Sequence, residues 1–322
     1  MTEATQSKIS TAPLKVGVIG TGALGRHHVR ILAEMPEAEL VGIHDTRPEI
    51  AQGLAETHGT VAYDDLEALA DEVEAVVLAV PTFAHAEIGC QLLERGIHVQ
   101  VEKPLTSTLE EADQLLEAAA GSSGSPVLAV GHVEFYNPAV QALLGLGERA
   151  RYVEIQRLSP FTPRSLDIDV ILDLMIHDLQ ILHAIDPSPV AEIRATGIEV
   201  LSPKIDMTCA RIALESGLVA NITASRVSAE PVRKLRAYLE SRYCSIDYRD
   251  QEVKGYGLRE EGDQRVIVPA DLEVERREPL RAENEAFVAA CRGDAVSYVD
   301  GAEGRRALAT ALAIREEIAR PG

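Results

Sequence analysis

The chain has 322 residues, of which 46% are hydrophobic, and 51 acidic against 31 basic side chains give it a net charge of −20. This length predicts about two domains, each with a sizeable core. A surface this acidic repels phosphate backbones and anionic lipids, which argues against nucleic-acid or membrane binding.

The start of the chain and its cysteines indicate a cytoplasmic protein. Residues 1–13 are polar and lack the apolar run of a signal peptide, so we expect a disordered tail. No apolar run in the sequence approaches the roughly 20 residues that a membrane span needs. The four cysteines are far apart and show no metal-ligand spacing, as expected for reduced thiols.

Strand-like and helix-like segments alternate over residues 14–132. Near-continuous apolar runs predict buried strands, and apolar residues at helical spacing predict the helices between them. The expected strands are 14–20, 38–45, 60–63, 74–80, 97–104 and 125–132, and the expected helices are 24–35, 48–59, 85–96 and 108–124. This alternation is typical of a Rossmann domain, an α/β doubly wound parallel sheet with helices on both faces.

The pattern changes over residues 133–322. A strand at 151–159 and several period-two segments between 191 and 250 predict a mostly antiparallel open sheet, and helices are expected at 167–185, 281–293 and 302–319. We interpret this region as an α+β domain for substrate binding and oligomerisation, whose final helices are able to pack back on the first domain. A sheet face without a helical cover usually finds a partner, so we expect a homodimer or homotetramer.

A glycine-rich loop follows the first strand and opens the first helix. Gly20, Gly22 and Gly25 have the GxGxxG spacing, which in this context predicts a dinucleotide site. The glycines allow a tight turn, a close approach of the pyrophosphate and packing of the helix on the strand. The helix N-terminus offers free N–H groups to the phosphates.

Asp45 ends the second strand, 20 residues after Gly25. A carboxylate at this place accepts hydrogen bonds from an adenosine ribose and repels a 2′-phosphate, which favours NAD. Arg47 is able to hold such a phosphate, so NADP remains the alternative.

The strand at 97–104 ends in Glu102, Lys103 and Pro104. Ligands of doubly wound sheets bind beyond the carboxyl ends of the strands, so this triplet is expected beside the nicotinamide half of the cofactor site. Charged groups at such a place are costly unless they are paired or used. Lys103 can reach a substrate hydroxyl, and Pro104 can fix the turn through a cis peptide bond.

Asp173 and His177 are four residues apart on the helix predicted at 167–185, so both side chains point the same way. A lone helix histidine is ordinarily a packing residue, but the carboxylate one turn earlier favours a catalytic role. The helix carries no second histidine at ligand spacing, so we expect no metal. The chain also lacks the GxSxG elbow of a hydrolase.

Together, the segments "GVIGTGALG", "AVPTFAH", "VEKPLTST" and "ENEAFVAACRGD" resemble the Gfo/Idh/MocA oxidoreductase family in order and over nearly the whole chain. The resemblance implies that Lys103, Asp173 and His177 form the catalytic group and that His85 lies near the nicotinamide ribose. The expected cofactor contacts are Gly20, Gly22, Ala23, Leu24, Gly25, Asp45, Thr46, Arg47, Val80, Thr82, His85, Glu102 and Lys103.

The segment "GHVEFYNPAV" is most similar to the branch of this family that oxidises the 3-hydroxyl of UDP-N-acetylglucosamine. That branch often reads E-R-F-N-P, whereas this chain has Phe135 and Tyr136 at the second and third positions. Arg157 and Arg164 can fork onto a diphosphate, although an ordinary strand or loop arginine is the alternative for each. The expected substrate contacts are Lys103, Tyr136, Asn137, Arg157, Arg164, Asp173 and His177.

Three functions are compatible with these residues. The first is an NAD-dependent dehydrogenase of a sugar or nucleotide sugar, in which His177, oriented by Asp173, removes the hydroxyl proton and Lys103 stabilises the alkoxide. The roles of His177 and Lys103 can be exchanged. The second is another activity of the family, namely an inositol, diol or biliverdin-type oxidoreductase or an NAD-dependent glycosidase. The third is a non-catalytic NAD-binding sensor, against which the intact catalytic group argues.

Overall fold

The computed structural model describes residues 12–162, 168–262 and 264–320, and the chain divides into two compact units. The first unit runs to Gly131 and takes in Leu280–Ala302. The second unit comprises His132–Pro279 and the chain from Glu303 onwards. The expected domain boundary, after residue 132, lies one residue from this division. Most of the expected N-terminal tail lies outside the described residues. Within the described ranges, every helix is too short or too polar to cross a bilayer.

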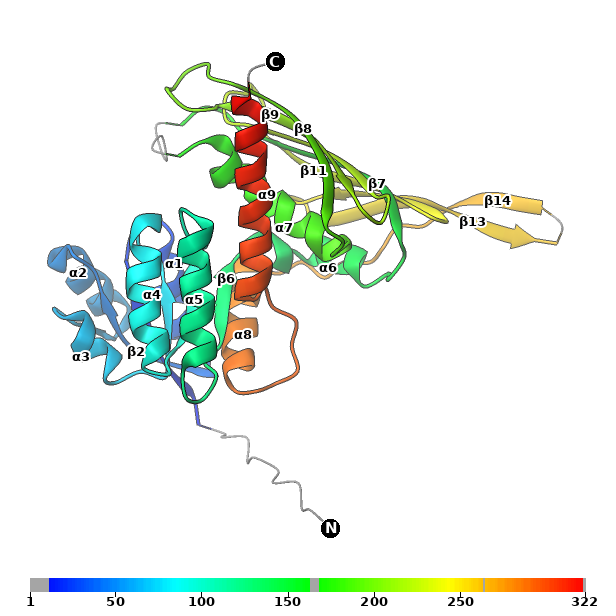
Figure 1. Cartoon of the computed structure of the whole chain (residues 1–322). Coiled ribbons are helices and arrows are strands. Elements are labelled where there is room, and N and C mark those ends of the chain that lie inside the picture. The colour runs from blue at the N-terminus through cyan, green and yellow to red at the C-terminus, as the bar shows by residue number, and fades with distance from the viewer. Residues whose placement is uncertain (1–11, 163–167, 263, 321–322) are drawn as a thin grey trace, which may run out of the picture. The chain divides into compact units, whose positions relative to one another are not determined.

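The first unit is built on a six-stranded parallel sheet with the strand order β3-β2-β1-β4-β5-β6 (Figure 1). Figure 1 shows α4 and α5 packed side by side on one face of this sheet. The predicted doubly wound fold is therefore confirmed. Its strands are β1 (Leu14–Ile19), β2 (Ala38–His44), β3 (Val61–Ala62), β4 (Ala75–Leu78), β5 (His98–Glu102) and β6 (Leu128–Gly131). Its helices are α1 (Gly25–Glu34), α2 (Pro48–His58), α3 (Leu66–Ala70), α4 (His85–Glu94), α5 (Leu109–Gly121) and α8 (Pro279–Cys291), with a 3₁₀ turn, η1 (Thr82–Ala84).

Local sequence signals fix several helix ends in this unit. Pro48 occupies the first turn of α2, and Gly59 ends that helix in the left-handed conformation, with φ of +68°. Thr108 and Glu111 form a complete capping box at the start of α5.

The core of the first unit includes a helix from the far end of the chain. Val16 on β1 and Leu32 on α1 are completely buried in the same cluster as Phe287 on α8. The helix α8 thus contributes to the core of the first unit. Most of α9 (Gly301–Ala319) belongs to the second unit.

The second unit contains an eight-stranded sheet with the order β14-β13-β12-β11-β7-β10-β9-β8. All neighbouring strands are antiparallel except β7 and β10, which confirms the predicted mostly antiparallel sheet. The strands are β7 (Ala150–Leu158), β8 (Val190–Ile198), β9 (Met207–Leu214), β10 (Val219–Ser225), β11 (Val232–Leu239), β12 (Arg242–Asp247), β13 (Glu252–Glu261) and β14 (Gln264–Pro269). Figure 1 shows the hairpin of β13 and β14 extending away from the other strands.

One face of this sheet is buried and the other is open. Ile155, Ile222 and Leu235 lie opposite one another on neighbouring strands and are completely buried. Along β9, buried residues alternate with exposed or half-buried ones, as expected when one face is covered. The helical elements of this unit are η2 (Val133–Tyr136), α6 (Pro138–Leu144), a π-helical turn η3 (Ile171–Met175), α7 (Ile176–Ile185) and α9. The helix expected at 167–185, whose first residue lies outside the described residues, is thus a π turn over Ile171–Met175 followed by an α-helix over Ile176–Ile185.

Candidate active site

The loop between β1 and α1 has the geometry of a phosphate-binding loop. Gly20 has φ of +89°, and a Cβ there would lie 2.5 Å from the carbonyl oxygen of Ala79. A Cβ on Gly25 would lie 1.9 Å from the Gly20 oxygen, so both positions require glycine. At Gly22 the space is open, and the nearest atom to an added Cβ is Nη2 of Arg47, at 4.0 Å. This open position leaves room for a pyrophosphate against the backbone, so the loop fits a dinucleotide.

Asp45 follows β2 and is almost completely buried. Its Oδ2 accepts hydrogen bonds from the backbone N and Oγ1 of Thr21, at 2.7 and 2.9 Å. Arg47 donates to the same carboxylate from its backbone N and Nε at 3.0 Å and from Nη2 at 3.1 Å. The Arg47 guanidinium, with the Thr21 bonds, holds the pKa of Asp45 well below its usual range. Asp45 is therefore a fixed negative charge at the end of β2.

A pocket of about 540 Å³ lies beside this loop. Gly22, Ala23 and Arg47, which were expected as cofactor contacts, all line it. Arg26 also lines it and was not singled out from the sequence. The complete lining is Thr21, Gly22, Ala23, Arg26, Arg47, Ile50, Gly53, Leu54 and Thr57. Two further expected contacts, Leu24 and Thr46, are exposed.

His85 begins α4 and is 1% exposed. Its Nδ1 lies 3.1 Å from the carbonyl oxygens of Pro104 and Leu105, and its Nε2 lies 3.0 Å from the carbonyl oxygen of Val80. The ring therefore joins the segment after β4 to the segment after β5. Its nitrogens are used inside the unit, so His85 positions these two strand ends.

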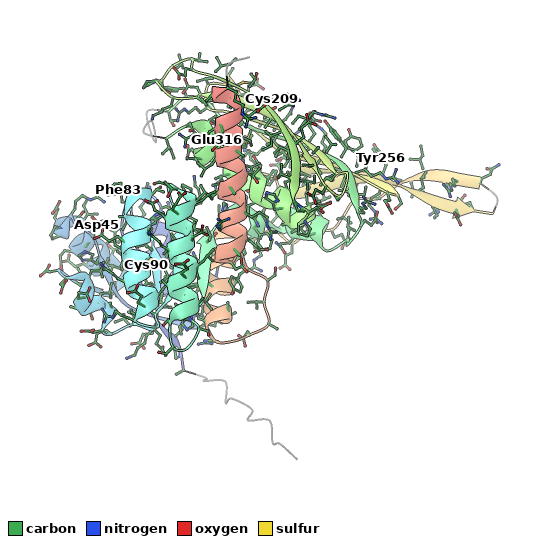
Figure 2. The ribbon with its side chains drawn as sticks, viewed as in Figure 1. Asp45, Phe83, Cys90, Cys209, Tyr256 and Glu316 are labelled. Atoms are coloured by element: carbon green, nitrogen blue, oxygen red, sulfur yellow. The ribbon has the colours of Figure 1, made fainter. Side chains whose placement is uncertain are left out.

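The segment after β4 also presents an aromatic side chain. Phe83 lies in η1, between half-buried Thr82 and buried His85, and is 77% exposed. Figure 2 shows Phe83 and Asp45 toward the same end of the first unit. Phe83 is not among the expected cofactor contacts, because a single aromatic residue has no periodic signal.

The end of β5 carries the predicted triplet. Glu102 is buried, and its Oε2 accepts a hydrogen bond from the backbone N of Lys103 at 3.1 Å. Its Oε1 lies 2.8 Å from Nε2 of His28, a residue of α1 that is not among the expected site residues. The peptide bond between Lys103 and Pro104 is cis, as the sequence suggested. Lys103 itself is half-buried.

In the second unit, Asp173 lies in the π turn η3 and His177 lies in the first turn of α7. The N–H of Ile176 bonds to the carbonyl of Ile171, which widens the helix at this point. Such wide turns are frequent at functional sites. His177 is buried, and its ring contacts that of His132 edge-on, with centroids 5.7 Å apart. His132 is not among the expected site residues.

Arg157 lies inside the second unit, 3% exposed. Its Nε and Nη2 bind both carboxylate oxygens of Asp178, at 2.9 and 2.7 Å, and its Nη1 binds Glu134 at 2.6 Å. The guanidinium also lies over the ring of Tyr248, 5.3 Å from its centroid. Burial alone would raise the pKa of Glu134, but Arg157 outweighs this effect and lowers it. Arg157 is thus occupied within the core, which is at odds with the expected diphosphate contact.

Two other expected substrate residues are also buried. The Asn137 side chain caps α6 by accepting from the backbone N of Ala139 at 3.1 Å and donates to the Tyr248 carbonyl at 2.9 Å. Tyr136 is 6% exposed and packs edge-on against Phe135. These contacts give both residues a structural role. Arg164, the remaining arginine, lies outside the described residues.

The first unit defines the class of protein. A parallel sheet, a glycine loop open at its second glycine and an ionised carboxylate after the second strand are the features of a dinucleotide-binding oxidoreductase domain. Here that domain is followed by an α+β unit.

Comparison with known proteins agrees with this class. Residues 14–132 match the model of the Gfo/Idh/MocA group, described as an oxidoreductase family with an NAD-binding Rossmann fold. UDP-N-acetylglucosamine 3-dehydrogenase of Acidithiobacillus ferrooxidans is 37% identical over 314 residues, covering 94% of this chain and 96% of that protein. Inositol 2-dehydrogenase 2 of Paenarthrobacter aurescens is 25% identical over 313 residues, covering 90% and 91%.

Solved structures show the same relationship. A structure of the Acidithiobacillus ferrooxidans enzyme matches with a TM-score of 0.88, covering 95% of this chain and 97% of that chain at 37% identity. Levoglucosan dehydrogenase in complex with NADH and levoglucosan matches with a TM-score of 0.83 at 21% identity, over 95% and 97%, and so shows the fold alone. The chain belongs to the Gfo/Idh/MocA oxidoreductase family.

Proposed function

We propose that this protein is an NAD-dependent dehydrogenase that oxidises a secondary hydroxyl of a nucleotide sugar, with the 3-hydroxyl of UDP-N-acetylglucosamine as the first candidate. The observation that supports this substrate is the 37% identity to a UDP-N-acetylglucosamine 3-dehydrogenase over 94% of the chain. Because that similarity spans both units, it includes the region expected to bind the sugar as well as the coenzyme domain.

The first unit supports the coenzyme half of the proposal. The glycine loop, Asp45 and Arg47 would hold the pyrophosphate and adenosine end of the dinucleotide, and the ends of β4 and β5 would face its nicotinamide end. The ionised Asp45 favours NAD over NADP, because its charge repels a 2′-phosphate. Bound NAD supplies an acceptor for the hydride that leaves the sugar carbon.

The proposed catalytic residues are Lys103, Asp173 and His177. An ammonium group at the end of β5 can hold the substrate oxygen and stabilise the negative charge that develops on it. His177 removes the hydroxyl proton as general base, and Asp173, in the π turn before it, orients the ring. We do not include Arg157, Asn137 or Tyr136 as substrate contacts, because each is buried and used within the second unit.

A substrate panel tests the function. Reduction of NAD, followed by its absorbance, is measured with UDP-N-acetylglucosamine, UDP-glucose, UDP-N-acetylgalactosamine, glucose 6-phosphate and myo-inositol. We expect the highest kcat/KM with UDP-N-acetylglucosamine and an oxidised product at C3. A preference for inositol, glycoside cleavage without net NADH, or NAD binding without turnover of any substrate would contradict the proposal.

Two variants test the catalytic residues. K103M and H177N are each expected to lower kcat by at least about 100-fold while NAD still binds, because they remove transition-state contacts. K15M, which changes an exposed lysine at the start of β1, is the matched control and should keep wild-type kcat. Near wild-type turnover in both variants would show that the assignment is wrong.

We also propose that the protein forms a homodimer or homotetramer through the open face of the eight-stranded sheet. Tyr238, Tyr256 and Ile267 are 42%, 59% and 75% exposed, and Figure 2 shows Tyr256 on the strand that leads into the projecting hairpin. Contiguous apolar groups of this kind usually mark an interface. Light scattering after size-exclusion chromatography should give two or four copies, and Y238E should dissociate them; a monomer at micromolar concentration would contradict this.

We propose a cytoplasmic location for the protein. All four cysteines are free thiols, and Cys209 is exposed, which suits a reducing compartment. Cell fractionation tests this, and recovery outside the cytoplasm would oppose it.

A further inference from the structure

A buried group of polar side chains lies directly beneath Lys103 in the first unit. It brings together His28 from α1, Gln100 and Glu102 from β5, and Glu283 and Asn284 from α8. All five are at most 6% exposed. Burying two carboxyl groups and an imidazole this deeply costs free energy unless their charges are paired and their donors face acceptors.

Both carboxyl oxygens of Glu102 have a hydrogen-bonding neighbour, one of which, the backbone N–H of Lys103, can only donate. Oε2 accepts from the backbone N of Lys103 at 3.1 Å, and Oε1 lies 2.8 Å from Nε2 of His28. The second contact is a charge-assisted hydrogen bond to the Glu102 carboxylate when His28 Nε2 carries the proton. Asn284 is compatible with this, since its Oδ1 and Nδ2 both lie 3.1 Å from Nδ1 of His28 and can serve either tautomer.

Glu283 has the opposite environment. Its Oε1 accepts from Nε2 of Gln100 at 3.0 Å, and its Oε2 is buried without a hydrogen-bond partner in the described part of the chain. The titratable groups that face it are Glu102 on β5 and His28 on α1, and the three residues present atoms within 4.8 Å of one another. Burial, and then the negative charge of Glu102, raise the pKa of Glu283 well above its usual range. Two carboxylates this close and this buried cannot both be ionised.

We propose that Glu283 is a positioning residue that stays an uncharged carboxylic acid, so that Glu102 keeps its contacts with both His28 and the backbone N–H of Lys103. A second negative charge at Glu283 would repel the Glu102 carboxylate and release the strand end that carries Lys103. The inference deepens the function proposed above and rests on it, because Lys103 is the group whose placement is set.

A metal ion held by His28, Glu102 and Glu283 is the competing explanation for the same atoms. The contact between His28 and Glu102 argues against it, because 2.8 Å is a hydrogen-bond distance. Two ligands with metal bonds of about 2.0 Å in tetrahedral geometry are roughly 3.3 Å apart.

Three variants test the proposal. E283Q replaces the acid with a neutral group of the same shape, whose amide oxygen can accept from Gln100 as Oε1 does now. E283A removes that contact and leaves the space of the side chain empty. E285Q makes the same chemical change two residues further along α8, at a half-buried glutamate that pairs with Arg281, and is the matched control.

Activity is measured as kcat and KM between pH 6 and pH 10. We expect E283Q to keep kcat within about twofold of wild type at pH 7, whereas E283A loses on the order of tenfold in kcat with little change in KM. Wild type and E285Q should lose kcat as rising pH ionises Glu283, and E283Q should lack that loss. Identical alkaline profiles for wild type and E283Q would overturn the proposal, since a residue that only fills space would give that result.

Two readouts do not depend on turnover. The difference infrared spectrum of wild type minus E283Q should contain the C=O band of a carboxylic acid at pH 7, and wild type minus E285Q should not. The difference in Tm between E283Q and wild type should grow by roughly 2 °C per pH unit from pH 5 upward. Above this pH the unfolded wild-type chain releases the proton of Glu283 whereas the folded protein keeps it, so wild type loses stability and E283Q does not. Absence of the band, parallel Tm curves or a stoichiometric divalent metal lost in E283Q would each refute the inference. If K103M stays active while both readouts hold, the proposed function fails and the protonation state of Glu283 stands.

Discussion

Arg157 and Asp178 form a bidentate ion pair inside the second unit, and Asp178 follows His177 directly along α7. Arg157 lies on β7, so the pair fixes the helix that carries the proposed base to the central part of the sheet. Glu134 completes the arrangement from η2, close in sequence to His132, whose ring contacts that of His177. The orientation of His177 is thus tied to a buried ionic cluster.

R157M should destabilise the protein by about 3–5 kcal/mol, because it leaves buried Asp178 without its cation and Glu134 with the longer 3.5 Å contact to Arg233. Urea unfolding followed by circular dichroism measures this loss. R194A removes an exposed arginine paired with Glu192 on β8 and should leave the midpoint unchanged. Equal midpoints for R157M and wild type would show that the buried pair does not stabilise the fold.

G22A should weaken NAD binding by about tenfold or more, roughly 1.4 kcal/mol, while the fold remains intact. The added methyl group occupies the open position of the glycine loop and meets no protein atom nearer than 4.0 Å. Calorimetric titration with NAD measures the effect. G121A places a methyl group in open space at the end of α5 and should bind NAD as wild type does. Unchanged affinity in G22A would place the pyrophosphate elsewhere.

Coenzyme choice should depend on Asp45 and Arg47 in opposite directions. D45A removes the charge that repels a 2′-phosphate and frees Arg47, so the ratio of kcat/KM for NADP to that for NAD should rise roughly tenfold. R47A should lower the same ratio. Steady-state kinetics with NAD and with NADP measures this ratio. If the ratio is the same in D45A, R47A and wild type, neither residue contacts the adenosine ribose.

Stability should fall on acidification because of His183. Burial, followed by the charge of Arg306, lowers the pKa of His183 to about 4 from 6.5. The unfolded chain therefore binds a proton that the folded protein excludes between pH 6.5 and pH 4, and stability is lost as pH falls through this window. The contribution is about 3 kcal/mol in total.

H183Q, which can keep the contact with Oγ1 of Thr310, should remove this part of the pH dependence. Unfolding free energies of wild type and H183Q are compared from pH 7.5 to pH 4. H27Q, at an exposed histidine, is the control and should follow wild type. Parallel curves for wild type and H183Q would mean that His183 is protonated as readily in the folded protein as in the unfolded chain.

G131A, a change on β6, should displace Glu102 at the end of the neighbouring strand β5. A Cβ on Gly131 would lie 2.9 Å from the carboxyl carbon of Glu102, so that side chain must move. We expect a loss of about 1–3 kcal/mol in stability and a lower kcat. G257A, whose Cβ makes an ordinary 3.5 Å contact in β13, should show neither effect. Full activity in G131A would mean that the position of Glu102 can change without consequence.

The parts of the site that depend on local sequence could be predicted. The glycine loop and Asp45 lie within or next to single elements, where spacing and strand position fix them. The fold class followed for the same reason, since hydrophobic periodicity is a local property.

Residues whose role depends on distant partners could not be predicted. His28 and Glu102 are 74 positions apart, and Gln100 and Glu283 are 183 apart, yet each pair is in contact. Arg157 was expected to face a diphosphate, but its direction is set by Asp178 on α7. An arginine in a sequence has the same signature whether it binds a ligand or a buried carboxylate.

The chain crosses between its two units three times, after Gly131, after Pro279 and after Ala302. During synthesis, α8 emerges from the ribosome only when most of the chain has been made. The core of the coenzyme domain is therefore incomplete until Phe287 has been added. A nascent or truncated product that stops before α8 would expose this apolar surface to chaperones and proteases. Neither unit can be inherited, exchanged or expressed by cutting the gene at one place.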